Sequence, residues 1–333
     1  MTSVDLPWIL GRIQELTGDP VEPPLSIFHD TTLWMTIDRG DVLDIDGELF
    51  LVRCNEREGR FGLEDQPKFW VKRVISLSTG SRKIVKLTFQ EEFIVRIGEL
   101  SIRCFRSPQK EALVLEATQG DRRFMQGRRA MDSAGNIVRI IDFIDGTDLL
   151  SYISSLPSGH EVYFRDLFPL MLAHVMESLR GLSALHRHGL WHGDVRNDHL
   201  LVERETGSLV WIDFDLNQQF SDFDVFSVGN ILHCLVGKGF VTFREASALP
   251  GVAERLDDDD ASVFFRNRIM NLRGVFPYVP DKLNAVLMRF SCGAPVFYDR
   301  VDQVVEDLEE CAAEQGWPKE PAPGIPARGQ GPR

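Results

Sequence analysis

The sequence has few cysteines, and none of them belongs to a closely spaced pair. The five thiols among the 333 residues are Cys54, Cys104, Cys234, Cys292 and Cys311. Without a C-x-x-C pair, the chain lacks the usual spacing of a zinc site or a redox motif. We therefore expect free thiols in a reducing compartment, the cytoplasm.

Long apolar runs are also missing. No stretch of about 18 consecutive apolar residues, the length that spans a bilayer, occurs in the sequence. The first residues, "MTSVDLPWILGRIQEL", lack the basic segment and long apolar segment of a secretory signal. We expect neither secretion nor a membrane span.

Basic residues are outnumbered by acidic ones. The chain carries 37 Lys and Arg residues against 50 Asp and Glu, which gives a net charge of −13. A general nucleic-acid binder needs a basic surface to neutralise phosphates, so that class is excluded. Any phosphate site in this protein must be assembled locally from a few cationic groups.

The first half of the sequence has the alternation and turn signals of strands. "DVLDIDGELFLVRC" predicts a hairpin that turns at Asp46 and Gly47, and "FWVKRVISLSTGSRKIVKLTF" predicts a strand pair with its turn at residues 78–81. A helix is predicted from Pro108, a strand over "NIVRIIDFI" and a helix over "DGTDLLSYISSL".

The second half is mainly helical. Apolar residues recur at three- and four-residue spacing after position 165 and again after Val225, and weaker patterns cover about residues 281–290 and 300–314. The Pro- and Gly-rich residues 317–333 predict a disordered tail, because few apolar side chains offset its ordering entropy. The fold class is therefore α+β.

One stretch, "LWHGDVRNDHLLVERETGSLVWIDFD" at residues 190–215, gathers histidines and aspartates between apolar runs. The runs 200–202 and 209–212 flank a polar turn, which predicts an antiparallel hairpin. The start of its first strand and the end of its second share one edge, so the segment from Asp194 to His199 should lie near Asp213. Carboxylates that converge in this way are best explained by a shared divalent cation.

The motif "HGDVRNDH" followed by "IDFD" resembles the catalytic loop and metal-binding motif of the protein-kinase-like phosphotransferases. Earlier parts of the family pattern stand in the same order. "SRKIVKL" resembles its third strand, with Lys86 as the phosphate-binding lysine, and "KEALVLEAT" resembles the next helix, with Glu111 as the partner of that lysine. "FDVFSVGNIL" resembles the buried helix whose first aspartate, Asp224, braces the catalytic loop.

The resemblance implies a bilobal protein-kinase-like fold, with an antiparallel-sheet N-lobe that contains one helix and a mainly helical C-lobe. The predicted divisions are an N-terminal extension at 1–45, an N-lobe at 46–145, a C-lobe at 146–316 and the disordered tail at 317–333.

The resemblance also implies roles for individual residues. Asp194 would orient or deprotonate the acceptor hydroxyl, Arg196 would steady the transferring phosphoryl group, and Asp213 would bind magnesium. Lys86 would hold the α and β phosphates of ATP, with Glu111 fixing its side chain.

Nucleotide-binding roles fall on two further segments. The partial glycine-rich loop "REGRFGLEDQ" offers Gly59 and Gly62. The backbone of Asp142, Phe143 and Ile144, in a stretch similar to the family's hinge, would bond the adenine.

The sequence departs from the family at several positions. His199 stands where the family has a metal-binding asparagine. Because imidazole prefers softer ions than magnesium, the metal could instead be manganese, or His199 could act only as a hydrogen-bond donor. Gly193 and Asp215 give "HGD" and "IDFD". Only residues 214–223 separate Asp213 from Asp224, which leaves no room for a long activation segment.

These features predict an enzyme that transfers the γ-phosphoryl group of ATP to a hydroxyl. The first hypothesis is a shortened Ser/Thr protein kinase of bacterial-like type. A kinase of a small molecule, sugar or lipid headgroup is the first alternative, and a nucleotide-binding pseudokinase scaffold is the second. A metal hydrolase that uses His192, Asp194, Asp198 and His199 is the third, although it leaves the Lys86 and Glu111 resemblances unexplained.

Overall fold

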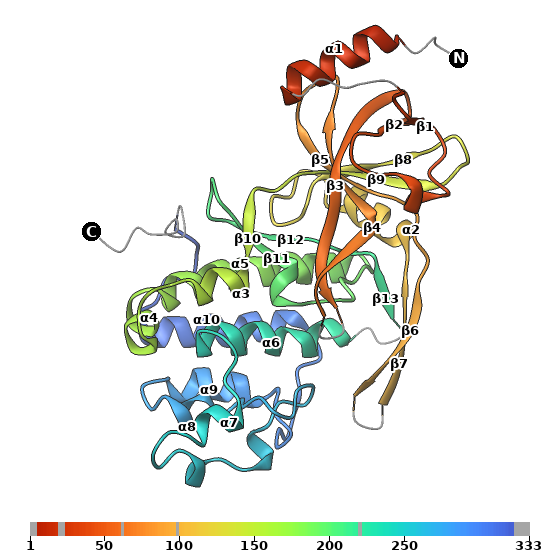
Figure 1. The fold of residues 1–333 in the computed structure, drawn as a ribbon. Coiled ribbons are helices and arrows are strands. Elements are labelled where there is room, and N and C mark those ends of the chain that lie inside the picture. Colours follow the sequence, from red (N-terminus) through yellow and green to blue (C-terminus); the bar gives the residue numbers. More distant parts are fainter. Residues whose placement is uncertain (1–4, 19–23, 61–62, 98–99, 219–221, 323–333) are drawn as a thin grey trace. The chain divides into compact units, whose positions relative to one another are not determined.

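The computed structural model describes residues 5–18, 24–60, 63–97, 100–218 and 222–322. It is a mixed α+β protein with a curled, largely antiparallel sheet and, within the described ranges, ten α-helices (Figure 1). The α+β class predicted from the sequence is therefore confirmed. The chain divides into two compact units, and it passes from one to the other several times.

Unit 1 comprises residues 1–92, 106–120 and 125–143. Its seven strands pair in the order β1-β2-β3-β4-β5-β9-β8, and every pair except β1 with β2 is antiparallel. The elements of the unit are α1 (Leu6–Thr17), β1 (Ile27–Phe28), β2 (Val42–Ile45), β3 (Glu48–Arg60), β4 (Leu63–Ser76), β5 (Arg82–Lys86), α2 (Pro108–Ala117), β8 (Gly127–Met131) and β9 (Ile137–Asp142).

The two predicted hairpins of this half are confirmed. Asp46 and Gly47 connect β2 to β3 with φ angles of 53° and 79°, the left-handed pair that a tight two-residue hairpin turn requires. The turn after Ser76 leads β4 back into β5, with Arg82 opposite Ile75. Local turn chemistry thus fixes the register of both pairs.

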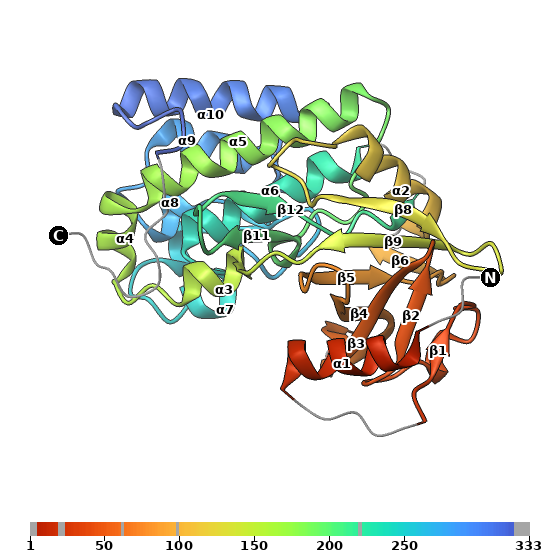
Figure 2. The ribbon, with the colours of Figure 1, turned by 90° about the horizontal axis from the view of Figure 1, so that it is seen from above.

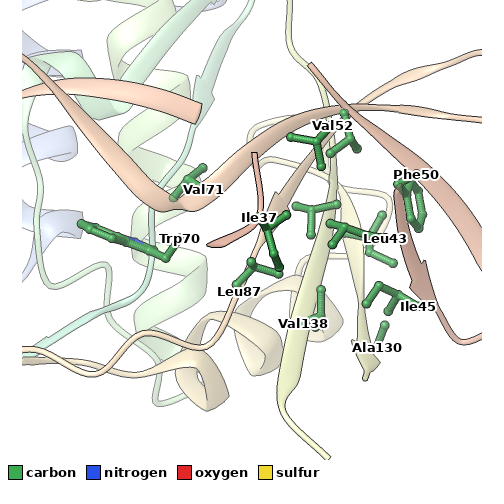
Figure 3. Close-up of a cluster of buried hydrophobic side chains, with 13 residues drawn as sticks. Ile37, Leu43, Ile45, Phe50, Val52, Trp70, Val71, Leu87, Ala130 and Val138 are labelled. Carbon is green, nitrogen blue, oxygen red and sulfur yellow. The ribbon is translucent and has the colours of Figure 1, made fainter. Parts of the chain in front are cut away.

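The alternation of side chains along β2 and β3 separates two apolar clusters. Val42 pairs with Leu51 on the face that receives Ile9 and Ile13 of α1. The next residues along β2 and β3 face the opposite cluster, which holds the main core of the unit (Figure 3). That core contains Ile37, Leu43, Ile45, Phe50, Val52, Trp70, Val71, Val74, Val85, Leu87, Ala130, Val138 and Ile140.

The segment predicted as an N-terminal extension belongs to unit 1. Within residues 1–45, α1 covers one face of β2 and β3, and β1 and β2 supply two strands of the sheet. Ile9 and Ile13 are fully buried there, so the segment contributes to the apolar core of this unit.

Unit 2 comprises residues 93–105, 121–124 and 144–333. Its helices are α3 (Leu149–Ser154), α4 (His160–Asp166), α5 (Phe168–Arg187), α6 (Phe223–Gly237), α7 (Phe243–Ala246), α8 (Leu272–Val275), α9 (Asp281–Met288) and α10 (Val301–Gln315). Figure 2 shows α5 and α10 side by side. The helices predicted after position 165, from Val225, and near 281 and 300 are all present.

Two small sheets complete unit 2. The first joins β10 (Gly146–Asp148), β11 (Leu200–Glu203) and β12 (Leu209–Trp211), so the hairpin predicted inside residues 190–215 is confirmed. The second has the order β13-β7-β6, from β6 (Glu92–Ile97), β7 (Leu100–Arg106) and β13 (Leu216–Gln218). The sequence had given no prediction for the second sheet.

The start of the predicted disordered tail has defined contacts. Trp317 meets Phe164 and Phe168 edge-on, with ring centroids 6.0 and 5.3 Å away, and Arg180 donates to the carbonyl of Lys319. Residues 323–333 lie outside the described residues. No helix in the described part of the chain has the length and apolar character needed to cross a membrane.

Candidate functional site

Lys86 and Glu111 form a buried ion pair in unit 1. Lys86 is the last residue of β5, and Glu111 lies in the first turn of α2, which Ser107 caps by accepting from the amide of Lys110. The Lys86 Nζ lies 2.6 Å from Glu111 Oε1, and the side chains are 8% and 0% exposed. The structure thus brings these two predicted site residues together.

Arg139 completes this buried group, and the sequence analysis missed it. Arg139 lies opposite Lys86 on β9, and its Nε donates to Glu111 Oε2 at 3.1 Å. Its Nη1 also donates to the carbonyls of Leu87 and Ile137. Two cations therefore hold the two oxygens of one carboxylate, which fixes the position of the Glu111 side chain. An arginine inside the apolar run "NIVRIID" was the available signal.

The predicted hinge residues lie at the division between the units, since Phe143 ends unit 1 and Ile144 begins the last segment of unit 2. The amide of Asp142 donates to Gln126 O at 2.8 Å, and that of Phe143 donates to Arg82 O at 3.4 Å. Lys83 pairs with the Asp142 carboxylate. The adenine-binding role of this backbone stays a prediction.

The partial glycine-rich loop lies in part outside the described residues. Gly59 lies near the end of β3, and Gly62 lies outside the described residues. Their nucleotide-binding role also stays a prediction.

In unit 2, Asp224 holds the segment that contains the predicted catalytic loop. This aspartate is fully buried at the start of α6, and its two oxygens accept from the amides of His192 and Gly193, each at 2.7 Å. Gly193 has φ +83°, a backbone conformation that explains glycine at this position of the motif. His186 Nε2 also lies 2.9 Å from Asp224.

His192 is part of the apolar support of the loop. The ring is completely buried and lies 4.4 Å from the Phe214 ring and 5.2 Å from the Trp211 ring, centroid to centroid. Its Nδ1 accepts from the amide of Asp194 at 3.3 Å. The ring therefore supports the backbone of the loop by packing against aromatic side chains.

Asp194, the predicted base, lies among charged groups. Arg196 Nη1 and His199 Nδ1 are 3.8 and 3.6 Å from Asp194 Oδ2. Burial raises the pKa of Asp194, the carboxylates of Asp213 and Asp198 raise it further, and His199 and Arg196 oppose that change. A carboxyl group with a raised pKa is a stronger proton acceptor once ionised, which suits a general base.

Arg196 is held mainly by Asp198. Its Nε and Nη2 donate to the two oxygens of Asp198 at 2.9 and 2.5 Å, a bidentate arrangement that fixes the plane of the guanidinium. The role predicted for Arg196 requires this plane to present a cation at the reacting phosphoryl group.

The hydrogen bond of His199 decides which of its ring nitrogens is available to a metal. Nδ1 lies 2.8 Å from the backbone oxygen of Asp194, and because a carbonyl can only accept, Nδ1 carries the proton. In the neutral ring Nε2 then has a lone pair, and it lies 3.7 Å from Asp213 Oδ2. Histidine ligands of metals are commonly oriented by such a bond from the other nitrogen.

Asp213, two residues after the end of β12, has an unusual backbone conformation. Its φ is +66°, and unlike Asp46 it is not part of a two-residue hairpin turn. Non-glycine residues held in this region often occur at functional sites. Across the described ranges, no group of three or more His, Cys, Asp or Glu side chains is arranged to hold a metal.

The strand after Asp213 is held by the β6–β7 hairpin. Leu216 of β13 packs with Ile102 and Cys104 of β7. The Cys104 thiol has a raised pKa, first because it is buried and also because the Asp194 carboxylate lies near it. The hairpin therefore lies beside the segment that carries the predicted catalytic residues.

The predicted site residues thus form two groups. Lys86 and Glu111 lie together in unit 1, and Asp194, Arg196, His199 and Asp213 lie together in unit 2. No protein-family model matches the chain, and a comparison with curated proteins finds no match to its sequence. The likeness to protein-kinase-like phosphotransferases rests on the motifs and on these contacts.

Proposed function

We propose that the protein is an ATP-dependent phosphotransferase that moves the γ-phosphoryl group of ATP to a hydroxyl acceptor. The observation that carries the proposal is the segment from His192 to His199, which Asp224 holds by two backbone amides and which brings Asp194 beside His199 and Asp213. The order of elements along the chain supports a two-lobed protein-kinase-like arrangement, in which units 1 and 2 would be the N-lobe and C-lobe.

In this reaction the acceptor oxygen bonds to the γ phosphorus while the bond from that phosphorus to the β,γ-bridging oxygen of ATP breaks, and ADP leaves. Asp194 takes the proton of the acceptor hydroxyl. Its raised pKa and its position beside Arg196 support this role. Arg196, fixed by Asp198, provides positive charge where negative charge develops.

Asp213 and His199 would hold the divalent metal. The lone pair on His199 Nε2 and the carboxylate of Asp213 are 3.7 Å apart, which fits two ligands of one ion. When bound, the ion would neutralise phosphate charge during transfer. Because one of the two ligands is an imidazole nitrogen, manganese suits the pair at least as well as magnesium.

Lys86 would bind the α and β phosphates. The Glu111 carboxylate, held from its other side by Arg139, fixes the ammonium group in position, so its location does not depend on the nucleotide. Such preorganisation lowers the entropic cost of binding.

A small hydroxyl-bearing acceptor is favoured over a protein by the segment after Asp213. Three of the ten residues between Asp213 and Asp224 form β13, which pairs with β7. A segment this short and already paired offers a peptide little docking backbone. This supports the small-molecule alternative over the Ser/Thr protein kinase reading.

The test is a thermal shift with ATP and Mg²⁺ or Mn²⁺ together with ADP release, for wild type, Asp213→Asn and Asp194→Asn. We expect a metal-dependent rise in melting temperature that Asp213→Asn loses. Asp194→Asn should keep the rise and lose turnover by about 10²- to 10⁴-fold. The exposed Asp258→Asn is the matched control and should leave both readouts unchanged.

Two outcomes would change the proposal. The absence of any thermal shift in wild type would refute nucleotide binding. A shift that Asp213→Asn abolishes, without ADP release for any acceptor, would favour the pseudokinase.

A further inference from the structure

Arg268 is a cation held between two aromatic rings in unit 2. The centre of its guanidinium lies 3.7 Å from the centroid of the Phe240 ring and 3.9 Å from that of the Phe265 ring. Its backbone is fixed as well, because Arg268 forms an isolated antiparallel bridge with Thr242. Stacking on both faces leaves the edge of the guanidinium, where the N–H donors lie, as the side that can bind.

That edge has no acidic partner in the described part of the chain. Arg268 Nη1 donates to Asn230 Oδ1 at 3.3 Å, and no carboxylate oxygen of the described residues lies within ion-pair distance of the guanidinium. Burial lowers the pKa of Arg268 to about 10, so the group remains a cation at neutral pH. A partly buried cation without a counter-ion is costly, and an anion at the edge would offset that cost.

Asn230 connects Arg268 to the predicted catalytic loop. Its backbone oxygen accepts from Asn197 Nδ2 at 3.3 Å, and its side-chain oxygen accepts from Arg268. Asn197 lies three positions after Asp194 and is 5% exposed. Because Nδ2 is the bonded atom, Oδ1 faces the other way, and it has no hydrogen-bond partner within the described ranges.

We propose that Arg268 forms an anion-binding subsite for the acceptor, which would be a small hydroxyl-bearing molecule with a carboxylate or phosphate group. This inference rests on the proposed phosphotransferase function. The guanidinium edge would bind the anionic group in a bidentate manner. An acceptor held there would be positioned relative to Asp194, because Asn230 and Asn197 connect the guanidinium to the predicted catalytic loop.

The binding test follows the Nε–Hε resonance of Arg268 in ¹⁵N-labelled full-length protein, assigned by its loss in Arg268→Gln. The probes are inorganic phosphate and, separately, acetate. We expect a saturable shift of this resonance with both probes, and no shift in that of Arg266, an exposed arginine two positions away. Absence of a saturable shift of the Arg268 resonance with either anion would overturn the subsite, whatever the protein does with ATP.

The turnover test compares ADP release with glycerol against glycerol 3-phosphate, and with glucose against gluconate. We expect the anionic member of each pair to stimulate ADP release more than the neutral member does. Arg268→Gln should raise its KM by roughly 10- to 100-fold, the size of one lost charge-assisted hydrogen bond. Arg266→Gln should match wild type. Arg268→Lys keeps the positive charge but loses the planar pair of N–H donors, so its KM for the anionic acceptor should lie between those of wild type and Arg268→Gln. Thermal melts confirm that each variant is folded.

The two arms separate the two proposals. Anion binding at Arg268 without ADP release would refute the phosphotransferase and leave the anion site in place. ADP release that prefers neutral acceptors, that is stimulated only by a serine-containing peptide, or that Arg268→Gln does not alter would refute the small anionic acceptor while the phosphotransferase stands.

Discussion

At the scale of single residues, the informative contacts are those that fix a functional group from two sides. Glu111 is held by Lys86 and Arg139, and Asp224 holds two consecutive amides of the predicted catalytic loop. The sequence motifs predicted Lys86, Glu111 and Asp224. They did not predict Arg139, because a charged residue in a strand reads as exposed until its partner on another element is known.

Replacement of Glu111 by Gln would remove the carboxylate that the buried Lys86 and Arg139 share. We expect a loss of about 3 to 5 kcal/mol in the free energy of unfolding, the cost typical of breaking a buried ion pair from one side. Chemical denaturation measures this loss. Glu116→Gln, on the exposed face of the same helix, is the matched control and should change stability by less than about 0.5 kcal/mol. Equal stability of the two variants would contradict the buried role of Glu111.

The side chain at position 199 should set the preference between metals. In His199→Asn an amide oxygen replaces the imidazole nitrogen beside Asp213, and oxygen ligands suit magnesium. We expect weaker binding of Mn²⁺ relative to Mg²⁺ in the variant, measured by Mn²⁺ electron paramagnetic resonance with Mg²⁺ as competitor. His188→Asn, at an exposed helix end, is the control. An unchanged ratio would assign His199 a role in orienting the backbone of Asp194 only.

At the scale of elements, the sequence predicted what depends on local pattern. The hairpins at Asp46-Gly47 and at residues 200–212 and the long helices α5 and α6 follow from turn residues and from periods of two or 3.6. The β6–β7 hairpin was missed, although "FIVRI" and "SIRCF" alternate. Its partner is β13, more than 100 residues later, and no local pattern encodes that pairing.

The strand β13 should control the order of the segment that contains Asp213. Leu216→Ala removes its apolar contact with Ile102 and Cys104. We expect a loss of roughly 2 to 5 kcal/mol in local stability, typical of a buried Leu→Ala change. Amide hydrogen exchange should quicken over residues 213–218 before it does elsewhere in unit 2.

A control separates this effect from general destabilisation. Leu113, which is 52% exposed on α2, is the matched leucine for the same substitution and should leave exchange unchanged. Exchange over 213–218 that is as slow in Leu216→Ala as in wild type would contradict a dependence on β7.

At the scale of the whole molecule, acid should destabilise the fold through a buried histidine. His233 is completely buried in α6, its Nε2 accepts from the amide of Val241, and burial together with nearby Arg268 lowers its pKa to about 4. The unfolded chain binds a proton near pH 6.5, and the folded one does so only near pH 4. The contribution of His233 to the free energy of unfolding is therefore fully present above pH 6.5 and is lost as the pH falls toward 4.

The lost stability amounts to about 3 kcal/mol over that range. Urea unfolding at pH 7 and pH 4.5 should show a fall in the free energy of unfolding for wild type. The slope of stability against pH should be shallower in His233→Gln, whose side-chain amide can still accept from Val241. The exposed His188→Gln should keep the wild-type slope. Identical slopes in all three proteins would contradict the neutral state of His233.

The path of the chain has a consequence for synthesis on the ribosome. The β6–β7 hairpin of unit 2 is made before residues 106–120 and 125–143 of unit 1, and its partner β13 begins 110 residues after β7 ends at Arg106. At translation rates of about 5 to 20 residues per second, β7 presents an unpaired edge and its apolar residues Ile102 and Cys104 for roughly 5 to 20 seconds. An unpaired strand edge with exposed apolar side chains favours aggregation, so the nascent chain is vulnerable during that interval.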